Sequence, residues 1–468
     1  MSEKLVEPAK MNYFFGASWE DLGKTIKKAF RLNANSISNA YKNISDAWIY
    51  GGFFKKIASL MKNLITIIII AILGTAYALI FSAIHSVIVT VIMLIFYVIF
   101  GIVWLIDRLY LLVNKSRTDC PICKRSYLIP AYRCTCGEIH YQLVPNKYGV
   151  WKHKCKCKNK LPSTFLSGRS KLEATCPVCS AKIAAGEVKP VVFQLIGGSM
   201  SGKTVYLTAL FHQIFDKINE KSAVKYEIPN EFQPYFDDLK RWYAGEECPT
   251  TVQMSSQMYP LVLDVGKGMK RQFSIYDIAG EMFGSDMIYS QDMERQFQYC
   301  DGLFFVVDPY GGSKSIDGNM DASDFSQVSA NNVATNFVNY FISTKHTNAT
   351  KRSDKKVSVL IVKADIKEIK KNIGPAKIYS IYNSNQEKYS SEQECRNKIC
   401  KQYLIDMGLG STVNELEIHF KNVNYYPVSS IGHKKDGSEY TPWGVIEPLQ
   451  WMLSSVDSEL AKKMGIEK

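Results

Sequence analysis

The longest apolar run in the chain is Leu64–Ile106, whose 43 residues include no Asp, Glu, Lys or Arg. One straight helix of that length would measure about 65 Å, whereas roughly 20 apolar residues already cross a bilayer. The run therefore predicts a transmembrane helical hairpin over residues 63–110, with two spans and a tight turn near residues 82–86. One long kinked helix, or a hydrophobic hairpin outside a membrane, is the alternative.

Residues 1–62 mix aromatic side chains with Lys and Arg at loosely helical spacing. This pattern fits an amphipathic helix on the membrane surface as well as an ordinary helical lead-in. Basic residues flank the apolar run on both sides, which favours both termini in the cytoplasm. The opening residues lack the long apolar core of a signal peptide.

Residues 188–468 alternate short apolar runs with amphipathic segments of helical period. "KPVVFQLIGG" reads as a first strand and "TVYLTALFHQIFDKI" as the helix after it. Later apolar runs, such as "CDGLFFVVDP" and "KVSVLIVKAD", also end at polar residues. This alternation predicts an α/β domain with a mostly parallel sheet and helices on both faces.

Charge separates the two halves of the chain. Residues 1–190 carry 26 Lys and Arg against 10 Asp and Glu, whereas the remainder carries 31 against 34. The basic character therefore belongs to the membrane and cysteine region. Basic residues beside an apolar segment are typical of contact with anionic headgroups, and nucleic acid is the weaker interpretation.

Eight of the 12 cysteines form four close pairs, which predicts two structural zinc sites in a double zinc ribbon over residues 117–187. We expect pairing in chain order, with an interleaved arrangement left open. Iron–sulfur ligation, or a ligand role for His140 or His153, is a lesser alternative. The ribbons act as a spacer or docking surface, or contact nucleic acid. The predicted ligands are Cys120, Cys123, Cys134, Cys136, Cys155, Cys157, Cys176 and Cys179.

A phosphate-binding loop follows the first predicted strand of the α/β domain. It matches the pattern G-x-x-x-x-G-K-[ST] between a strand and a helix. Backbone N–H groups of such a loop face the phosphates, the lysine reaches the β and γ phosphates, and the Thr hydroxyl ligates Mg²⁺. The predicted nucleotide-binding residues here are Gly197, Gly198, Ser199, Met200, Ser201, Gly202, Lys203, Thr204 and Val205.

Three further motifs stand at the ends of later predicted strands. "YDIAGE" holds a D-x-x-G motif from Asp277 to Gly280, "VKAD" holds Lys363 and Asp365, and "PVSS" ends with Ser429 and Ser430. Each motif alone is a common turn or helix cap. Their order after the phosphate loop is what makes them informative.

This order resembles the Ras-like, TRAFAC-class GTPases over about residues 188–458. The phrases "GGSMSGKTVYLTAL", "DIAGE" and "PWGVIEPLQWML" are similar to the bacterial double-GTPase families, which often accompany multi-gene conflict or defence systems. The resemblance implies that Thr204 and Asp277 hold Mg²⁺ and that Gly280 senses the γ-phosphate. It also implies that Asp365 reads guanine, beside Lys363, with help from the PVSS loop.

The chain departs from the family pattern at two positions. Residue 362 is Val where the pattern has Asn or Thr, and Glu281 stands where Ras-like proteins often carry Gln to orient the attacking water. We expect slow hydrolysis that needs a partner or an arginine finger. For the switch threonine, Thr250 and Thr251 are both available, and we choose Thr251.

These features together predict a membrane-anchored GTP-binding switch in the bacterial inner membrane, with slow GTP hydrolysis. It would use GTP or GDP, Mg²⁺ and two structural Zn²⁺ ions. The bilayer and a protein effector, co-encoded in such systems, are the expected partners, and a homodimer is left open. An ATP-driven phosphate-loop machine is the first alternative. A nucleotide-gated scaffold or nucleic-acid sensor without turnover is the second.

Overall fold

The computed structural model divides the chain into two compact units, Met1–Glu187 and Val188–Lys468. The structure describes residues 7–120, 123, 125–183, 185–221, 223–248, 256–266, 268–278, 280, 297, 299–311, 326, 328–343, 352–433 and 437–467.

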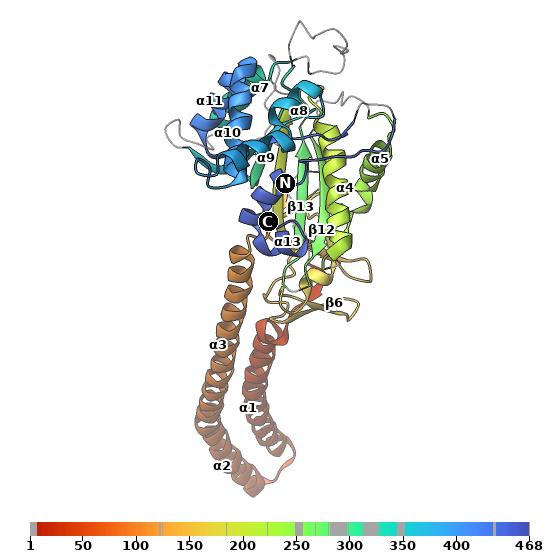
Figure 1. Ribbon diagram of the computed structural model, residues 1–468. Coiled ribbons are helices and arrows are strands. Elements are labelled where there is room, and N and C mark those ends of the chain that lie inside the picture. The colour runs from red at the N-terminus through yellow and green to blue at the C-terminus, as the bar shows by residue number, and fades with distance from the viewer. Residues whose placement is uncertain are drawn as a thin grey trace. The chain divides into compact units, whose positions relative to one another are not determined.

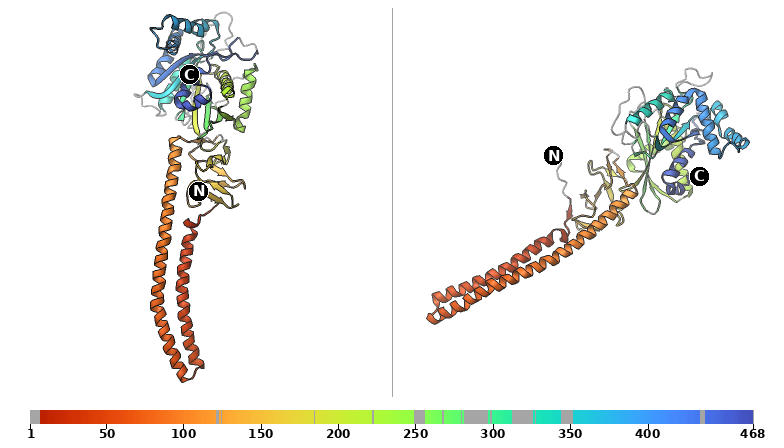
Figure 2. Two further views of the ribbon diagram at one scale, coloured as in Figure 1. Left: turned by 60° about the horizontal axis from the view of Figure 1, so that its bottom comes forward. Right: turned by 90° about the vertical axis from the view of Figure 1, so that its left-hand side faces the viewer.

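Long helices dominate the first part of the first unit. Helix α1 (Ala17–Tyr50) is followed by α2 (Phe53–Ile69), a π-helical turn (Ile70–Gly74) and α3 (Thr75–Val113). The last three form one continuous helical rod, which runs antiparallel to α1 (Figure 2).

The predicted turn near residues 82–86 is wrong, because these residues lie inside α3. The Ser86 hydroxyl donates to the Ser82 carbonyl oxygen at 2.7 Å, so this polar side chain is satisfied within the helix. No Gly or Pro interrupts the backbone there. The helices instead reverse at Gly51 and Gly52, whose backbone is extended. A Cβ on Gly51 would lie 2.4 Å from the Ala47 carbonyl oxygen, so a side chain does not fit at the end of α1.

Helix α1 packs along the rod through scattered polar contacts. The Asn33 amide donates to the Thr75 hydroxyl at 3.0 Å, and the Ser18 hydroxyl contacts the Met93 sulfur at 3.4 Å. Most apolar side chains of the rod remain exposed. In the described part of the chain, one helix, Phe53–Val113, is long and apolar enough to cross a membrane, with a mean hydropathy of 2.9 in its best window.

Short strands after α3 form the part of this unit that we call the cysteine module, residues 118–187. One sheet has the order β1-β6-β7, a second has the order β5-β4-β8-β9, and β2 pairs with β3. The strands are β1 (Ala9–Lys10), β2 (Thr118–Asp119), β3 (Ser126–Tyr127), β4 (Ala131–Arg133), β5 (Ile139–His140), β6 (Lys152–Cys155), β7 (Lys160–Pro162), β8 (Glu173–Thr175) and β9 (Lys182–Ile183).

The segment before α1 belongs to this module, which the sequence pattern did not predict. Strand β1 pairs antiparallel with β6. The buried Glu7 carboxylate lies 2.8 Å from His140 Nδ1 and accepts the backbone N–H groups of Tyr141 and Gln142 at 3.0 and 3.1 Å. The chain ahead of α1 is therefore held on the cysteine module.

A buried ionic cluster holds the C-terminal part of α3 on the same module. Arg169, with no exposed surface, donates to Asp107 of α3 at 3.0 Å and to Glu187 at 2.7 Å. Asp107 also accepts the backbone N–H of Phe165 at 2.8 Å. A buried charge is tolerated when it is paired and hydrogen-bonded in this way.

Replacing Arg169 by Met should destabilise the cysteine module by about 3–5 kcal/mol, because the substitution leaves two buried carboxylates without their cation. The matched control is Arg133→Met, whose half-exposed partner Glu173 lies 4.0 Å away. We expect the control to cost less than about 1 kcal/mol. Hydrogen exchange of the β4 and β8 amides in detergent-solubilised full chain measures both. Equal protection in the two variants would contradict a stabilising role for the cluster.

A mixed seven-stranded sheet of order β11-β12-β13-β10-β14-β15-β16 forms the centre of the second unit (Figure 1). The strands from β13 to β16 in this order are parallel. Strand β12 pairs antiparallel with β13, and β11 pairs antiparallel with β12. The strands are β10 (Lys189–Gly197), β11 (Lys225–Glu227), β12 (Gln257–Asp264), β13 (Arg271–Asp277), β14 (Gly302–Val307), β15 (Ser353–Ile361) and β16 (Phe420–Pro427).

Helices cover both faces of this sheet. Adjacent residues of β14 point to opposite faces: Phe304 contacts Tyr206 of α4, whereas Phe305 contacts Phe337 of α7. The helices are α4 (Lys203–Lys221), α5 (Gln233–Tyr243), α7 (Ala330–Ser343), α8 (Lys367–Ile373), α9 (Pro375–Ser384), α10 (Glu392–Leu404), α11 (Gly410–His419), α12 (Glu447–Val456) and α13 (Ser458–Lys463).

Candidate functional site: a phosphate loop and two cysteine tetrads

The phosphate loop joins the carboxyl end of the central strand β10 to the first turn of α4. Met200 and Gly202 have positive φ angles of 58° and 89°, which turn the loop backbone around a concave centre. The buried Lys203 Nζ donates to the carbonyl oxygens of Gly197 and Gly198 at 3.0 and 2.7 Å. The Lys203 side chain therefore lies against the loop backbone, where bound phosphates would also lie.

Thr204 and Asp277 meet at the edge of this loop. The Thr204 hydroxyl donates to Asp277 Oδ2 at 3.1 Å, and no described group donates to the buried Oδ1. Burial raises the pKa of Asp277, and the nearby Lys203 charge and Thr204 hydroxyl act in the opposite direction. Hydroxyl and carboxylate oxygens are the ligands that Mg²⁺ prefers, so this pair fits the ion.

Gly280 lies directly against the phosphate loop. A Cβ at this position would lie 2.2 Å from the backbone nitrogen of Ser199 and 2.3 Å from the carbonyl carbon of Gly198. No side chain fits there without moving the loop. The D-x-x-G glycine is thus placed where its backbone can approach a terminal phosphate.

The loops after β15 and β16 bring the predicted base-reading residues together. The Ser429 hydroxyl donates to Asp365 Oδ1 at 2.8 Å and accepts the Gly432 N–H at 3.0 Å. The Ala364 N–H donates to the Val428 carbonyl oxygen at 3.1 Å, which ties the two loops. The hydroxyl of Ser429 thereby orients the Asp365 carboxylate.

Val362 occupies the place of the family's Asn or Thr and is buried. A Cβ on Gly202 would lie 4.0 Å from the Val362 Cγ2, so the valine side chain approaches the phosphate loop. The valine side chain is apolar, so it does not offer the phosphate loop the hydrogen bond that an Asn or Thr would.

Asp308, at the end of β14, is a site residue that sequence reasoning missed. Its buried carboxylate accepts Lys363 Nζ at 2.7 Å and the backbone N–H groups of Ser326 and Tyr310 at 2.9 and 3.1 Å. Lys363 itself has a positive φ of 57°. The signal available was the polar ending of "LFFVVDP", which has the same position on its strand as the motifs that were recognised.

Replacing Asp308 by Asn should lower guanine-nucleotide affinity about tenfold, since loss of the ion pair releases Lys363 and loosens the base loop. Equilibrium titration with a fluorescent GDP analogue measures the change. Asp301→Asn is the matched control, because Asp301 stands at the opposite end of the same strand, where it accepts the Val192 N–H at 2.9 Å. An equal loss in both variants would mean that strand stability, and not Lys363, sets the affinity.

The remaining predicted residues are placed as follows. Ser430 is buried beside Ser429, and Val205 lies in the first turn of α4. Thr250, Thr251 and Glu281 lie outside the described residues. The catalytic assignments of Thr251 and Glu281 thus stay predictions.

The eight paired cysteines form two tetrads in a nested arrangement, so the expected pairing in chain order is wrong. The outer tetrad joins the hairpins β2–β3 and β8–β9, and the inner tetrad joins β4–β5 and β6–β7. The Glu187 N–H donates to the Thr118 hydroxyl at 3.1 Å, and the Tyr127 hydroxyl lies 3.4 Å from Cys176 Sγ, so the first and last hairpins lie side by side. The outer tetrad is Cys120, Cys123, Cys176 and Cys179, and the inner is Cys134, Cys136, Cys155 and Cys157.

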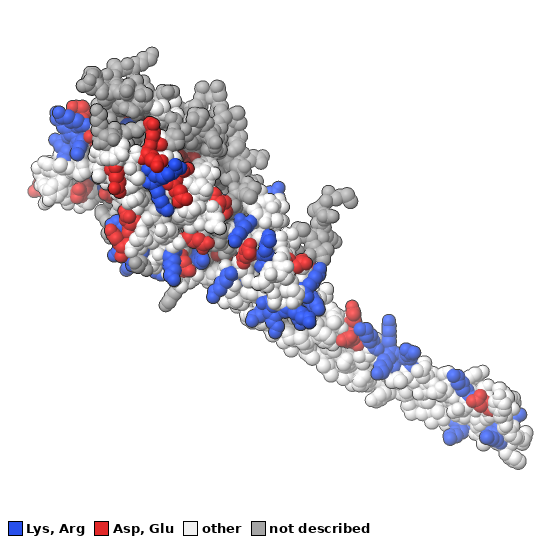
Figure 3. All heavy atoms as spheres, turned by 90° about the vertical axis from the view of Figure 1, so that its right-hand side faces the viewer, with Lys and Arg blue, Asp and Glu red and all other residues white. Residues whose placement is uncertain are grey.

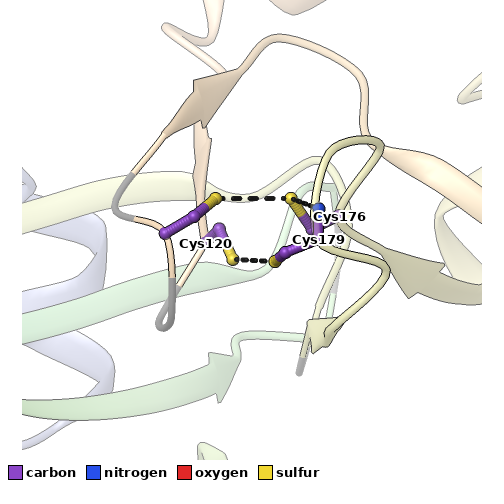
Figure 4. Close-up of side chains that lie close together, drawn as sticks. Cys120, Cys176 and Cys179 are labelled. Carbon is purple, nitrogen blue, oxygen red and sulfur yellow. Dashed lines mark hydrogen bonds between the residues drawn. The ribbon is translucent and has the colours of Figure 1, made fainter.

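The sulfur spacing suits a tetrahedral zinc ion. Four thiolates at about 2.3 Å from zinc would lie about 3.8 Å apart. The Sγ atoms of Cys120 and Cys179 lie 3.5 Å apart (Figure 4), and those of Cys123 and Cys176 lie 3.6 Å apart. The two closest inner pairs, Cys134 with Cys157 and Cys136 with Cys155, lie at 3.6 and 3.7 Å.

Hydrogen bonds to sulfur also favour a thiolate at the outer tetrad. Burial disfavours the charged form of Cys176, but backbone N–H groups of Cys179 and Val178 and the Tyr127 hydroxyl donate to it, and the pKa of Cys176 falls to about 6. His140 contacts Glu7, and His153 Nε2 lies 2.8 Å from the Val144 carbonyl oxygen. Neither histidine belongs to a described tetrad.

The family model called Double-GTPase 1 matches residues 194–360, from β10 to β15. Over these residues the second unit is similar to the double-GTPase family, which supports a GTP-hydrolysing P-loop enzyme. This match spans the phosphate loop, Asp277 and Asp308. The base-reading loops after β15 lie beyond it.

Three solved structures similar to the chain are GTPases or GTPase-like. The LeoA bacterial dynamin GTPase from ETEC shares 14% identity, with a TM-score of 0.27 over 59% of this chain and 36% of its own. The Arl6 BBS3 small GTPase from Trypanosoma brucei shares 10% identity, with a TM-score of 0.26 over 58% of this chain and 99% of its own. The S. cerevisiae Ski7 GTPase-like domain bound to GTP shares 10% identity, with a TM-score of 0.26 over 52% of this chain and 43% of its own.

The chain thus spans about a third of LeoA and less than half of the Ski7 chain. A comparison with curated proteins finds no match.

Proposed function

We propose that the chain is a membrane-anchored switch that binds GTP with Mg²⁺ and hydrolyses it slowly. The single observation that carries the nucleotide part is the arrangement of Lys203, Thr204 and Asp277 around one loop, inside a segment that matches a GTPase family. Thr204 and Asp277 would hold Mg²⁺, which supplies charge neutralisation at the β and γ phosphates when bound.

Guanine specificity is the part of the proposal that rests on the base loops. The oriented carboxylate of Asp365 would accept hydrogen bonds from guanine N1–H and the exocyclic amino group, which adenine does not offer. Lys363, held by Asp308, positions this loop. Val362 does not offer the hydrogen bond that the family's Asn or Thr makes at this position.

The test is nucleotide binding by the full chain in detergent with Mg²⁺, comparing GTP with ATP in wild type and Asp365→Asn. We expect tight GTP binding in the wild type and a change of preference to xanthine nucleotide in the variant. Equal or tighter ATP binding that the substitution does not alter would replace this proposal with an ATP-driven machine.

Membrane anchoring is proposed from the first unit. Because α1 packs along the rod, the helical pair would lie along the membrane surface. The exposed apolar side chains of α2–α3 would face the hydrocarbon, and the exposed basic residues of α1, Lys24, Lys27, Lys28 and Arg31, would face the headgroups. The two cysteine tetrads would hold structural zinc and so stabilise the module at the base of these helices. A setting in a multi-gene bacterial defence system, with a co-encoded effector, rests on the family resemblance.

A further inference from the structure

Three lysines stand side by side on neighbouring strands of the β1-β6-β7 sheet. In register, Lys10 lies opposite Lys154, and Lys154 lies opposite Lys160. All three are exposed, whereas the alternate residues His153, Cys155 and Leu161 are buried. We call these three residues the lysine row.

Further exposed lysines extend the row at the strand ends: Lys152, Lys156 and Lys158. Figure 3 shows basic side chains gathered in a dense group on this part of the molecule. The row exists only because strand β1 joins the sheet, since Lys10 is more than 140 residues before its neighbour in the chain. A pattern along the sequence does not reveal it.

The lysine row lacks a partner of opposite charge within the described residues. No ion pair there involves Lys10, Lys154, Lys160 or the three flanking lysines. Three described carboxylates near the module are used elsewhere, since Glu173 lies near Arg133 and Lys182, Glu7 near His140, and Glu187 near Arg169. Like charges directly opposite on neighbouring strands are destabilising, so a bound anion would reduce the electrostatic repulsion between these lysines.

We propose that the lysine row binds the headgroups of anionic phospholipids at the base of the helical pair. The proposal rests on the membrane anchoring proposed above. Asp107 pairs with Arg169, Tyr110 stacks on Phe165 at 4.8 Å, and the Asn12 N–H donates to the Lys147 carbonyl oxygen at 2.9 Å. These contacts hold the module where the apolar rod ends.

The chemistry beside the row also fits a membrane surface. Trp151, next to Lys152 in the chain, is 59% exposed. Tryptophan is enriched at the level of the headgroups, and lysines near the end of an apolar helix attract anionic lipid. Nucleic acid offers similar phosphates, but it does not account for the apolar rod in the same unit.

The test uses the full chain in nanodiscs, made either of phosphatidylcholine alone or of phosphatidylcholine and phosphatidylglycerol in equal amounts. Mass spectrometry follows how fast an amine-reactive reagent modifies each lysine. Anionic discs should slow modification of the row about fivefold, and high salt should reverse the effect. Lys370 and Lys371, exposed on α8 of the second unit, are internal controls that should not change.

A double variant, Lys154→Gln with Lys160→Gln, should remove the protection of Lys10 and Lys152. The matched variant, Lys370→Gln with Lys371→Gln, should leave that protection intact. Equal modification in both discs overturns the inference and leaves the anchoring in place. A chain that enters neither disc overturns both. Protection by single-stranded DNA in neutral discs, without an effect of anionic lipid, would identify nucleic acid as the ligand instead.

Discussion

Replacing Lys203 by Ala should lower the rate of GTP hydrolysis about 10²–10³-fold, the loss typical of removing one preorganised donor to a developing charge. The Nζ of Lys203 now bonds to the carbonyl oxygens of Gly197 and Gly198, so it is held at the loop before any phosphate arrives. A phosphate group would replace those carbonyls as its partner. Single-turnover hydrolysis of GTP by the full chain measures the change.

The matched control for this prediction is Lys370→Ala, which removes an exposed lysine from α8 of the same unit. It should hydrolyse GTP at the wild-type rate. The control should unfold at the wild-type temperature, whereas the Lys203 variant loses two hydrogen bonds to buried carbonyl oxygens and should unfold at a slightly lower temperature. If the Lys203 variant hydrolyses GTP as fast as the control, the phosphate loop is not the catalytic centre.

Much of the second unit could be predicted from its sequence because local pattern and burial agree there. Strand β14 is buried throughout and β15 is buried from residue 357 to 361, so each reads as a mainly apolar run that is followed by polar residues. The polar residues that end parallel strands meet at one edge of the sheet. The motifs at Asp277 and Asp365 were found for this reason, whereas Asp308 was missed because no motif contains it.

The first unit was harder because its organisation depends on contacts between distant segments. Length alone suggested two spans in the apolar run, but Ser82 and Ser86 do not stop the helix, and the Ser86 hydroxyl bonds to the Ser82 carbonyl oxygen within it. The reversal occurs at Gly51 and Gly52 instead. Likewise, spacing identified all eight cysteines, yet their pairing depends on contacts between the first and last hairpins, such as Tyr127 with Cys176, which lie far apart in the chain.

Nested pairing of the cysteines predicts which double substitutions remove one zinc ion and which remove two. Cys134→Ser with Cys157→Ser changes only the inner tetrad, so this variant should keep one zinc per chain. Cys120→Ser with Cys134→Ser changes both tetrads and should keep none. Pairing in chain order predicts the reverse for the two variants. Native mass spectrometry of the full chain in detergent counts the bound metal, and Cys300→Ser, a buried cysteine of the second unit, is the control that should retain both ions.

The loss of metal should also unfold the module, because binding of structural zinc contributes on the order of 10 kcal/mol to folding. The two hairpins that carry the inner tetrad lie, along the chain, between the two hairpins that carry the outer tetrad. Loss of the inner tetrad should therefore expose β6 and β7 to hydrogen exchange while β2, β3 and β9 stay protected. Loss of the outer tetrad removes the closure between the two ends of the module and should expose all of its strands. If loss of either tetrad exposes the same strands to hydrogen exchange, the two tetrads stabilise the module as one unit, and this prediction is wrong.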